Sequence, residues 1–458
     1  MRAAAVALLV QCVGCAYAEL SSKRAWAAKP VMGWSTWVAL GKAATHDDVV
    51  ANANLLQSSG LFSAGYAMIQ IDDGWQQLYG GNWIVRQYFP QPPSSKKVSK
   101  GGGVFWPPPP PAGVNPGCIV ADPVKYPQGM AGLSAIVHGM GFRFGLYTSG
   151  TDSQCSSTAV HPVYLSGRYT AQDATCFVDM GIDMIKVDNC NWQYDALRNR
   201  PASRMEAWRA ALPQNISLYD CHFGCLAATC SKWVTCPWSV TPARNAHLEA
   251  WCSATVDLAR TTNDIEPTWN SVLRNANSLW GRGTVSRPGF WSDPDYLVPR
   301  EAPVMTAGQR RAQFSLWCIT SSPLLISTDL RTLSADTLAM LGNADAIRVD
   351  QTYAAGDAGD RIAVDATRGL WVYKKSLGGG ETAVLIVHVG AQSGVPKALG
   401  GNAPGVQQTY ALPMSTFHAS ACMVKNVWTT QSRRLNATSN AFVVQPADCV
   451  FLLVSQCA

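Results

Sequence analysis

Short apolar runs alternate with longer stretches of helical period between residues 31 and 345. The strand-like runs fall at 31–37, 66–75, 142–150, 184–189, 216–222, 256–264, 290–295 and 323–328. Most segments between them repeat apolar residues with helical spacing, and Thr45 is a suitable N-cap for the first. Eight strands that alternate with helices predict a (β/α)8 barrel. An open doubly wound sheet is the alternative, but no glycine-rich nucleotide fingerprint follows the first strand.

The pattern changes after about residue 346. Strand-like runs follow one another there, separated by glycine, proline, serine and asparagine, and no amphipathic helix is visible in the sequence. This pattern predicts an antiparallel β-domain, in the form of a small sandwich. We therefore expect an α/β protein with a (β/α)8 TIM barrel over residues 19–346 and a C-terminal antiparallel β-sandwich over residues 347–458.

A proline-rich stretch interrupts the barrel pattern near residues 90–118. Five consecutive prolines at 107–111 fit neither the interior of a helix nor a sheet. Because the alternation of strands and helices resumes afterwards, we expect an insertion on the surface of the barrel. A solvated loop is the simpler interpretation, and binding of a cell wall or a partner is the alternative.

The N-terminus has the pattern of a secretory signal peptide over residues 1–18. Arg2 precedes an apolar run at 3–13, and Ala16-Tyr17-Ala18 fits a cleavage site before Glu19. The apolar run is shorter than the ~20 residues that a membrane span needs. We therefore expect a secreted, or a vacuolar or lysosomal, protein whose cysteines form disulfides. Two of the 15 cysteines leave with the signal peptide, and the odd remainder predicts at least one thiol without a partner in the chain.

Composition narrows the class of function. Hydrophobic residues make up 47% and charged residues 14% of the 458-residue chain, so a large core can be buried. The net charge of +6 is modest and spread out, without the basic run that is typical of nucleic-acid binding. Triplets of the N-glycosylation type begin at Asn215 and Asn436, which agrees with secretion.

Polar side chains gather where the predicted strands end. In the run 184–189, Lys186 and Asp188 face one side of the strand, and the aliphatic residues between them face the other. In a barrel the aliphatic residues meet the outer helices, so the charged pair lies inside, near the open mouth where barrel active sites are found. A single aspartate at a strand end is usually a cap or turn former. Here similar groups end several strands, at Trp34, Trp37, Asp72, Asp73, Tyr147, Arg260, Asp264, Asp293 and Asp295.

Carboxylates, a lysine, an arginine and tryptophans at one mouth suit a sugar. Aromatic rings stack on the apolar faces of a pyranose, and carboxylates accept hydrogen bonds from its hydroxyls. Two carboxylates can also cleave a glycosidic bond, one as the nucleophile and the other as the acid and base. The chain has 7 histidines and no conventional metal motif such as HExxH, so we expect neither a metal nor another cofactor.

Seven motifs, in matching order, resemble those of glycoside hydrolase family 27, the melibiases. They are MGWSTW, IDDGW, GLYTSGTDSQC, IKVDNC, RxxxD, WSDPDYL and FSLWCITSSPLLISTDLR, and they extend from about residue 30 to 350. The resemblance implies a retaining exo-glycosidase that removes terminal α-D-galactosyl residues by double displacement. Its partners would be α-galactoside oligosaccharides or glycoconjugates, with no nucleic acid and no membrane span, and it would be a monomer or homodimer.

The resemblance also implies roles for individual residues. Asp188 would be the nucleophile, kept ionised by Lys186. Asp264 would be the acid and base, with a pKa raised enough to carry a proton. Asp72 and Asp73 would bind the far hydroxyls of galactose. Further sugar contacts would come from Trp37, Tyr147, Arg260 and Asp295.

The chain departs from the family pattern after the fifth strand. Many family members have a glutamate there for the sugar 2-hydroxyl, and this chain has His222, which can still bond a hydroxyl. The resemblance implies a disulfide between Cys155 and Cys190 beside the nucleophile. Five cysteines lie between 221 and 252, where secretion favours disulfides over a zinc site, and we expect a bridge between Cys221 and Cys252.

Two other interpretations stay open. Another exo-glycosidase of the family would act on α-N-acetylgalactosaminides or β-L-arabinopyranosides. The bulk of His222 favours galactose over N-acetylgalactosamine, and the intact pair Asp72 and Asp73 disfavours an arabinopyranosidase, because those family members alter this pair. A non-catalytic sugar-binding protein would lack Asp188 or Asp264, and both are present.

Overall fold

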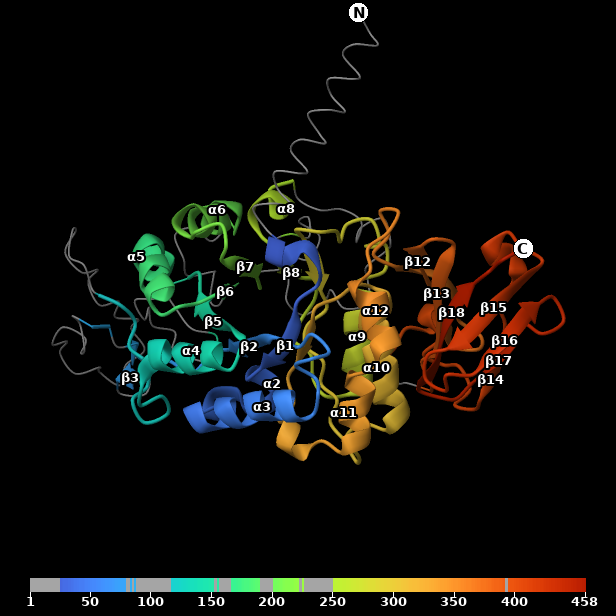
Figure 1. Cartoon of the computed structure of the whole chain (residues 1–458), viewed down its shortest axis with the longest axis horizontal. Coiled ribbons are helices and arrows are strands. Elements are labelled where there is room, and N and C mark those ends of the chain that lie inside the picture. The colour runs from blue at the N-terminus through green and yellow to red at the C-terminus, as the bar shows by residue number, and fades with distance from the viewer. Residues whose placement is uncertain are drawn as a thin grey trace, which may run out of the picture.

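A parallel eight-stranded sheet forms a barrel in the N-terminal part of the molecule (Figure 1). The structure, a computed structural model, describes residues 25–79, 83–84, 86–87, 117–151, 155, 166–189, 201–221, 225, 250–391 and 394–458. The predicted signal peptide and nearly all of the predicted proline-rich insertion lie outside these residues. The barrel strands are β1 (Met32–Ser35), β2 (Met68–Ile71), β5 (Arg143–Ser149), β6 (Met184–Asp188), β7 (Ser217–Asp220), β8 (Leu258–Arg260), β9 (Trp291–Asp293) and β10 (Leu324–Ile326).

The strands follow one another around the barrel in the order β10-β1-β2-β5-β6-β7-β8-β9. Neighbouring strands in this order are parallel. A parallel bridge between Leu297, which follows β9, and Ile326 of β10 closes the ring. There the N–H of Leu297 donates to the carbonyl of Leu325 at 2.8 Å, and its carbonyl accepts from Ser327 at 2.7 Å. Each strand lies within one of the eight predicted runs, so the barrel prediction is confirmed.

Helices lie around the barrel (Figure 1), and several of them begin at side-chain caps. At α3, Thr45 and Asp48 bond each other's backbone N–H groups, and Thr306 and Gln309 do the same at α10. Among the described residues, no helix combines the length and the apolar character that crossing a membrane requires. The helices are α2 (Trp37–Leu40), α3 (His46–Ser58), α4 (Gly129–Gly139), α5 (Ser166–Asp179), α6 (Pro201–Ala211), α8 (Cys252–Thr255), α9 (Trp269–Asn277), α10 (Ala307–Ile319), α11 (Ala335–Leu341) and α12 (Ala344–Gln351), with 3₁₀ turns η1 (Ala25–Ala28), η2 (Gly41–Ala43), η4 (Leu330–Thr332), η5 (Lys397–Leu399) and η6 (Met414–Phe417).

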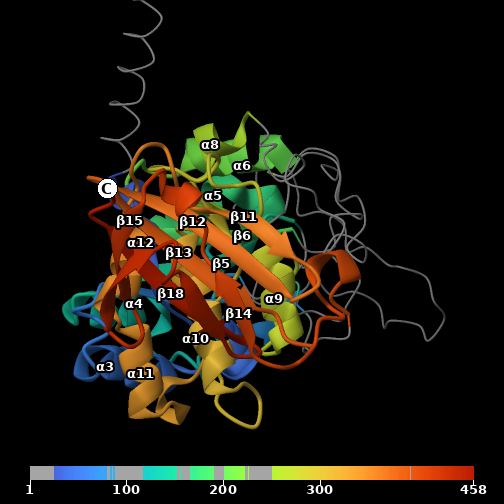
Figure 2. The same cartoon turned by 90° about the vertical axis from the view of Figure 1, so that its right-hand side faces the viewer.

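The C-terminal part is an antiparallel β-sandwich, which faces the viewer in Figure 2. Six strands pair in the order β11-β12-β13-β18-β15-β16, and β14 pairs with β17 in a second sheet. Aliphatic side chains from both sheets, such as Val372, Leu452 and Val444, form one buried cluster. The predicted sandwich is therefore confirmed. Its strands are β11 (Asp360–Asp365), β12 (Leu370–Gly378), β13 (Glu381–His388), β14 (Gln408–Ala411), β15 (Ala421–Asn426), β16 (Ser432–Asn436), β17 (Ala441–Val444) and β18 (Asp448–Ser455).

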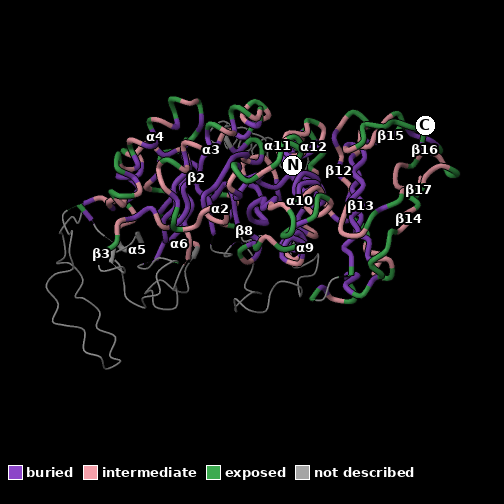
Figure 3. The backbone as a smooth tube through the Cα atoms, turned by 90° about the horizontal axis from the view of Figure 1, so that it is seen from below, coloured by how far each residue is buried: buried purple, intermediate pink, exposed green. Residues whose placement is uncertain are grey.

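The larger sheet of the sandwich packs its other face against α10 of the barrel. Side chains alternate along β18, so Leu452 enters the interior of the sandwich, whereas Phe451 and Leu453 join the core cluster that contains Trp317 of α10. Figure 3 shows the backbone buried along the barrel strands and along β12 and β13. The barrel and the sandwich thus share an apolar core.

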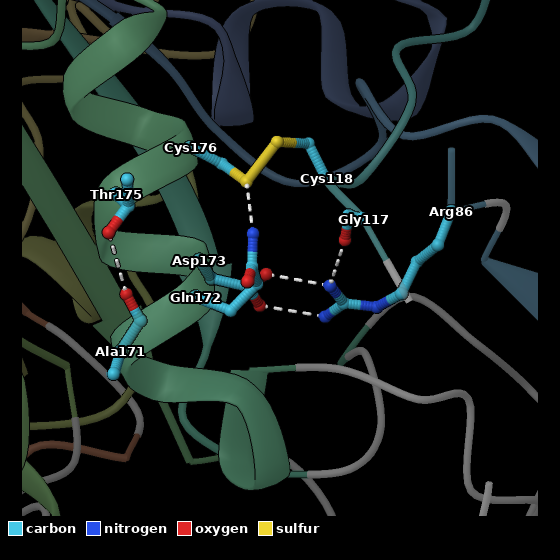
Figure 4. Close-up of a disulfide and its surroundings, with 8 residues drawn as sticks. All are labelled: Arg86, Gly117, Cys118, Ala171, Gln172, Asp173, Thr175 and Cys176. Carbon is cyan, nitrogen blue, oxygen red and sulfur yellow. Dashed lines mark hydrogen bonds and ion pairs between the residues drawn. A yellow bond between two sulfur atoms is a disulfide. The ribbon is translucent and has the colours of Figure 1, made fainter. Parts of the chain in front are cut away.

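A buried ion pair and a disulfide connect α5 to the segments that precede α4 (Figure 4). Cys118 and Cys176 are joined, and the guanidinium of Arg86 donates to both oxygens of Asp173 at 2.7 Å. Arg86 also donates to the carbonyl of Gly117 at 3.0 Å. Arg86 lies beyond the short hairpin of β3 (Leu78–Tyr79) and β4 (Trp83–Ile84), so these bonds fix the return of the chain after β2 onto the side of the barrel.

Candidate active site

The charged pair of β6 points into the barrel, as the alternation predicted. Ile185 and Val187 belong to the apolar core, whereas Lys186 is 3% exposed and Asp188 is partly buried at the carboxyl end of the strand. The register places Tyr147 of β5 opposite Lys186. The hydroxyl of Tyr147 donates to Oδ2 of Asp188 at 3.3 Å. Three of the predicted site residues therefore lie together on adjacent strands.

Lys186 forms its ion pair with the acid that follows β2. Its Nζ lies 2.9 Å from Oδ2 of Asp72, and it donates to the hydroxyl of Tyr296 at 2.9 Å. The hydroxyl of Tyr296 in turn lies 2.6 Å from the same Oδ2 and 3.1 Å from Oε1 of Gln70. Asp72 is thus held by a lysine, a tyrosine and, through Nε2 at 3.3 Å, the glutamine of its own strand.

Three tyrosine rings surround the Lys186 ammonium. Nζ lies 5.0 Å from the ring centre of Tyr296, 5.6 Å from that of Tyr219 and 5.9 Å from that of Tyr147. Aromatic faces attract a cation, so the rings help to stabilise its charge in a buried position. The sequence analysis missed Tyr296, Tyr219 and Gln70. Gln70 left a signal, because it is a polar residue between two isoleucines of a buried strand, and Tyr296 stands directly after Asp295 in the motif WSDPDYL.

Burial raises the pKa of Asp188 to about 7, with the charge of Lys186 acting against the shift and that of Asp264 adding to it. The N–H of Asn189 donates to its Oδ1 at 2.7 Å. Desolvation also acts to raise the pKa of Asp264, but the charges of Arg260 and Lys186 outweigh it and hold that pKa below its usual value. Nη2 of Arg260 lies 3.0 Å from Oδ1 of Asp264.

The order of these pKa values corrects the expectation drawn from the sequence. We expected Lys186 to lower the pKa of Asp188, and we expected a raised pKa at Asp264. At Asp188, desolvation by burial outweighs the charge of Lys186, which lowers the pKa as expected but pairs with Asp72. At Asp264, the charges of Arg260 and Lys186 outweigh desolvation. As the pH rises, Asp264 therefore loses its proton first and Asp188 loses its proton second.

Arg260 connects the ends of β8 and β9. Its Nη2 lies 2.9 Å from Oδ2 of Asp295, which also accepts the N–H of Ile265 at 2.7 Å. Burial raises the pKa of Asp295 to about 6. Asp295 has a positive φ of 80°, which is uncommon for a residue other than glycine. The backbone thus turns this carboxylate toward Arg260 and the loop that carries Asp264.

The remaining predicted sugar contacts have different positions. Asp73 is 3% exposed and accepts the N–H of Gly74 at 2.8 Å. Trp37 is partly buried as the first residue of α2, directly after β1. His222 and Cys190 lie outside the described residues, so their roles stay predictions. Cys155 is in a disulfide, and its Sγ lies 3.1 Å from Oδ2 of Asp188.

The expected bridge between Cys221 and Cys252 is wrong. Cys252 is bonded to Cys225, with 5.5 Å between their Cα atoms, and Cys221 is a free, buried thiol. Cys221 directly follows β7 and lies inside the mouth, where Nη1 of Arg260 donates to its sulfur at 3.5 Å. Because Cys221 lies inside the barrel mouth, Cys252 of α8 pairs with Cys225, the cysteine that follows Cys221 in the sequence.

Metal binding finds no support in the described part of the chain. Within it, no group of three or more His, Cys, Asp or Glu side chains is arranged to hold an ion. The acids at the mouth are instead bonded to Lys186, Arg260 and tyrosines. Such a set of carboxylates and hydrogen-bond donors can bind a polyhydroxylated ligand and transfer a proton.

Known proteins are similar to this chain both in sequence and in fold. Residues 114–352, more than half of the chain, match the family model described as Alpha galactosidase A. Alpha-galactosidase 3 of Arabidopsis thaliana is 28% identical over 337 residues, which are 73% of this chain and 63% of that protein. The probable alpha-galactosidase B of Aspergillus fumigatus is 28% identical over 334 residues, which are 69% of each. The chain therefore covers less than two thirds of the length of the Arabidopsis relative.

A solved structure extends the likeness to the fold of both domains. The crystal structure of alpha-galactosidase I from Mortierella vinacea has a TM-score of 0.70 and 19% sequence identity, over 93% of this chain and 97% of that one. At this identity the likeness shows the fold alone. Membership of the family is shown by the sequence match, which covers the segment from β5 to β10. This segment contains Lys186 and the acids Asp188, Asp264 and Asp295. This chain belongs to the melibiases, glycoside hydrolase family 27.

Proposed function

We propose that this protein is a secreted, retaining exo-glycosidase that hydrolyses terminal α-D-galactosyl residues. The observation that carries the proposal is the convergence of Asp188 and Asp264 on one barrel mouth, close enough for the charge of each to affect the other. Asp72, Lys186 and Arg260 surround them. Glycoside hydrolysis requires two carboxyl groups at one site, and a retaining enzyme uses one as the nucleophile and the other as the acid and base.

In the first step, a carboxylate oxygen of Asp188 attacks the anomeric carbon. The bond to the leaving oxygen breaks as Asp264 gives that oxygen its proton, which leaves a galactosyl ester on Asp188. In the second step, Asp264 takes a proton from water, the hydroxide attacks the same carbon, and Asp188 leaves as a carboxylate. Two inversions return the α-anomer. A retaining pair has carboxyl groups roughly 5–5.5 Å apart.

The protonation order restricts which form of the pair reacts. The pair holds one proton between the lowered pKa of Asp264 and the pKa of about 7 of Asp188. The productive form has this proton on Asp264, which is the minor arrangement in the free protein. A bound sugar that excludes water from the mouth and accepts hydrogen bonds from Arg260 would free Asp264 to hold the proton.

Sugar recognition would come from the buried acids and the aromatic side chains of the mouth. Asp73 and Asp72 would accept hydrogen bonds from the far hydroxyls, and Trp37 and Tyr147 would line the pocket. Oδ2 of Asp72 already accepts bonds from three side chains, which fix the position of this carboxylate at the mouth. His222 would lie at the sugar 2-position and favour galactose over N-acetylgalactosamine.

Secretion is supported by the disulfides of the described residues. Cys118–Cys176, Cys225–Cys252 and Cys422–Cys457 are bonded pairs, which persist in oxidising compartments. The signal-like sequence at residues 1–18 agrees with the same route. N-terminal sequencing of the protein exported from its own cells should begin at Glu19.

A panel of p-nitrophenyl glycosides tests the activity. We expect turnover of the α-D-galactoside, and NMR of the early product should show the α-anomer first. Preference for the α-N-acetylgalactosaminide or the β-L-arabinopyranoside would instead identify the protein as one of the other exo-glycosidases of the family. Binding of galactose without turnover of any glycoside would identify a sugar-binding protein, and β-galactose as the first product would indicate an inverting enzyme.

A further inference from the structure

Tyr296 follows Asp293 and Asp295, the acids at the end of β9, and its hydroxyl is bonded to the ammonium of Lys186. The ammonium of Lys186 has three N–H donors. One donates to Asp72 and one to the hydroxyl of Tyr296, each at 2.9 Å. Asp188 lies two residues further along the same strand, yet its carboxylate is not within ion-pair distance of Nζ, whereas that of Asp72 is.

Tyr296 closes a three-membered set of bonds with Lys186 and Asp72. Its hydroxyl accepts from the ammonium and donates to Oδ2 of Asp72 at 2.6 Å, so all three groups are bonded to one another. Tyr296 is 1% exposed, and the position of its ring is fixed by the apolar core. A ring fixed in this way leaves the lysine little freedom to turn toward the nucleophile.

We propose that Tyr296 is a positioning residue that holds Lys186 on Asp72 and away from Asp188, and so sets how the charge of the lysine is divided between the two acids. The inference rests on the proposed function for its catalytic meaning, since Asp188 is the nucleophile there. Without the tyrosine hydroxyl, the ammonium loses one acceptor, and the carboxylate of Asp188 becomes the acceptor toward which it can turn.

Other charged and titratable groups also face this part of the mouth. They are Asp73 after β2, Tyr147 on β5, Tyr219 and Cys221 on and after β7, Arg260 and Asp264 on and after β8, and Asp293 and Asp295 at the end of and after β9. The hydrogen bonds of the Tyr296 hydroxyl go to Lys186, Asp72 and Gln70 and not to these groups, so we expect them to keep their positions when it is removed. A change at Asp188 would therefore report on Lys186.

The test measures the protonation of Asp188 directly, in the full-length protein and without a substrate. Carbodiimide couples amines to protonated carboxyl groups, and mass spectrometry of the peptide that contains Asp188 gives the midpoint of labelling against pH. We expect this midpoint near pH 7 in the wild-type protein, as burial indicates. In Tyr296→Phe it should fall by roughly one pH unit, since a nearby opposite charge lowers a carboxyl pKa by about 1–3 units.

Tyr219→Phe is the matched control. It removes a hydroxyl from another ring beside Lys186, but that hydroxyl donates to Asp293 and not to the lysine or Asp72. The midpoint of Asp188 should stay near its wild-type value in this variant. An unchanged midpoint in Tyr296→Phe, or an equal shift in both variants, would overturn the inference.

A double-mutant cycle shows whether Tyr296 acts through the lysine. In a Lys186→Met background, Tyr296→Phe should no longer move the midpoint, and a shift of the same size there would contradict the proposal. If Tyr296→Phe does not fold, Tyr296→Met also lacks the hydroxyl and fills the same space with an adaptable apolar chain. Absence of α-galactoside turnover in the wild-type protein would refute the proposed activity alone, because the labelling needs no turnover.

Discussion

At the scale of single residues, Asp188 and Asp264 carry opposite pKa shifts although both end barrel strands. Asp188 is enclosed by the mouth and its pKa rises to about 7, whereas the guanidinium of Arg260 and the charge of Lys186 hold the pKa of Asp264 low. The difference comes from burial and from the choice of ion-pair partner. It follows that the two carboxyl groups can share one proton over a wide range of pH.

Replacement of the nucleophile should abolish turnover. Asp188→Asn replaces the attacking carboxylate with an amide, so we expect no measurable hydrolysis of an aryl α-galactoside. In Asp188→Gly, which leaves an empty place, azide or formate should partly restore turnover. Asp183→Asn is the control, because Asp183 lies just before β6, at the opposite end of the strand, and bonds the backbone of Phe144. Near-normal activity in Asp188→Asn would show that another group attacks the sugar.

Asp264→Asn should distinguish substrates by their leaving groups. A general acid contributes typically about 10²–10⁴-fold, and a leaving group that is already acidic needs little of that help. We expect the rate of the glycosylation step to fall much more for an alkyl galactoside than for a dinitrophenyl galactoside. Single-turnover rates on both substrates measure this step, and equal losses would mean that Asp264 is not the acid.

The shared proton predicts the pH dependence of the reaction. The pair keeps one proton below the pKa of about 7 of Asp188 and loses it above that value. For an alkyl galactoside, kcat/KM should therefore fall as pH rises through about 7, because no acid remains. The acid-side decline should begin only as Asp264 gains a proton, below its ordinary pKa of ~3.9. A profile that rises through pH ~7 instead would show that ionisation of Asp188 limits the rate.

At the scale of secondary-structure elements, buried ion pairs fix segments that the barrel pattern alone does not. Arg86 and Asp173 join the segment after β4 to α5, with side chains 1% and 0% exposed. Asp173→Asn leaves the guanidinium buried without its full partner. We expect a loss of about 3–5 kcal/mol in the free energy of unfolding, measured by denaturant titration.

An exposed pair of the same geometry provides the comparison. Arg348 of α12 donates to both oxygens of Glu381 on β13, and their side chains are 43% and 28% exposed. Glu381→Gln should change the free energy of unfolding by no more than about 1 kcal/mol. Similar losses in Asp173→Asn and Glu381→Gln would mean that burial does not determine the contribution of these pairs.

At the scale of the whole molecule, β18 connects two cores through its opposite faces. Leu452 packs inside the sandwich, whereas Leu453 packs with the barrel and α10. Because the two parts share apolar surface, we expect them to unfold in one calorimetric transition. Leu452→Ala and Leu453→Ala should each lower the free energy of unfolding by roughly 2–5 kcal/mol and move that single transition to lower temperature. Two transitions, of which Leu452→Ala moves one, would show that the sandwich unfolds independently.

The sequence was sufficient to predict the barrel, the sandwich and most of the candidate site. A strand's alternation is local, so Lys186 and Asp188 could be assigned to the inner face before any partner was known. Parallel strands bring their carboxyl ends to one mouth, and this rule gathered Asp72, Tyr147 and Arg260 with them. These predictions needed only the spacing of residues within each run.

The partners of Lys186 and Cys252 and the protonation of Asp188 and Asp264 depended on distances between strands, which the sequence does not give. Whether Lys186 bonds Asp72 or Asp188 is a matter of a few ångströms across the barrel, and so is the choice of Cys225 over Cys221 as the partner of Cys252. Tyr296 stands next to Asp295 in the motif WSDPDYL, but the sequence does not show that its hydroxyl reaches Lys186 and Asp72 across the barrel. Coulomb interactions and covalent bridges act through space, and residues far apart in the chain acquire their separations only when the barrel closes.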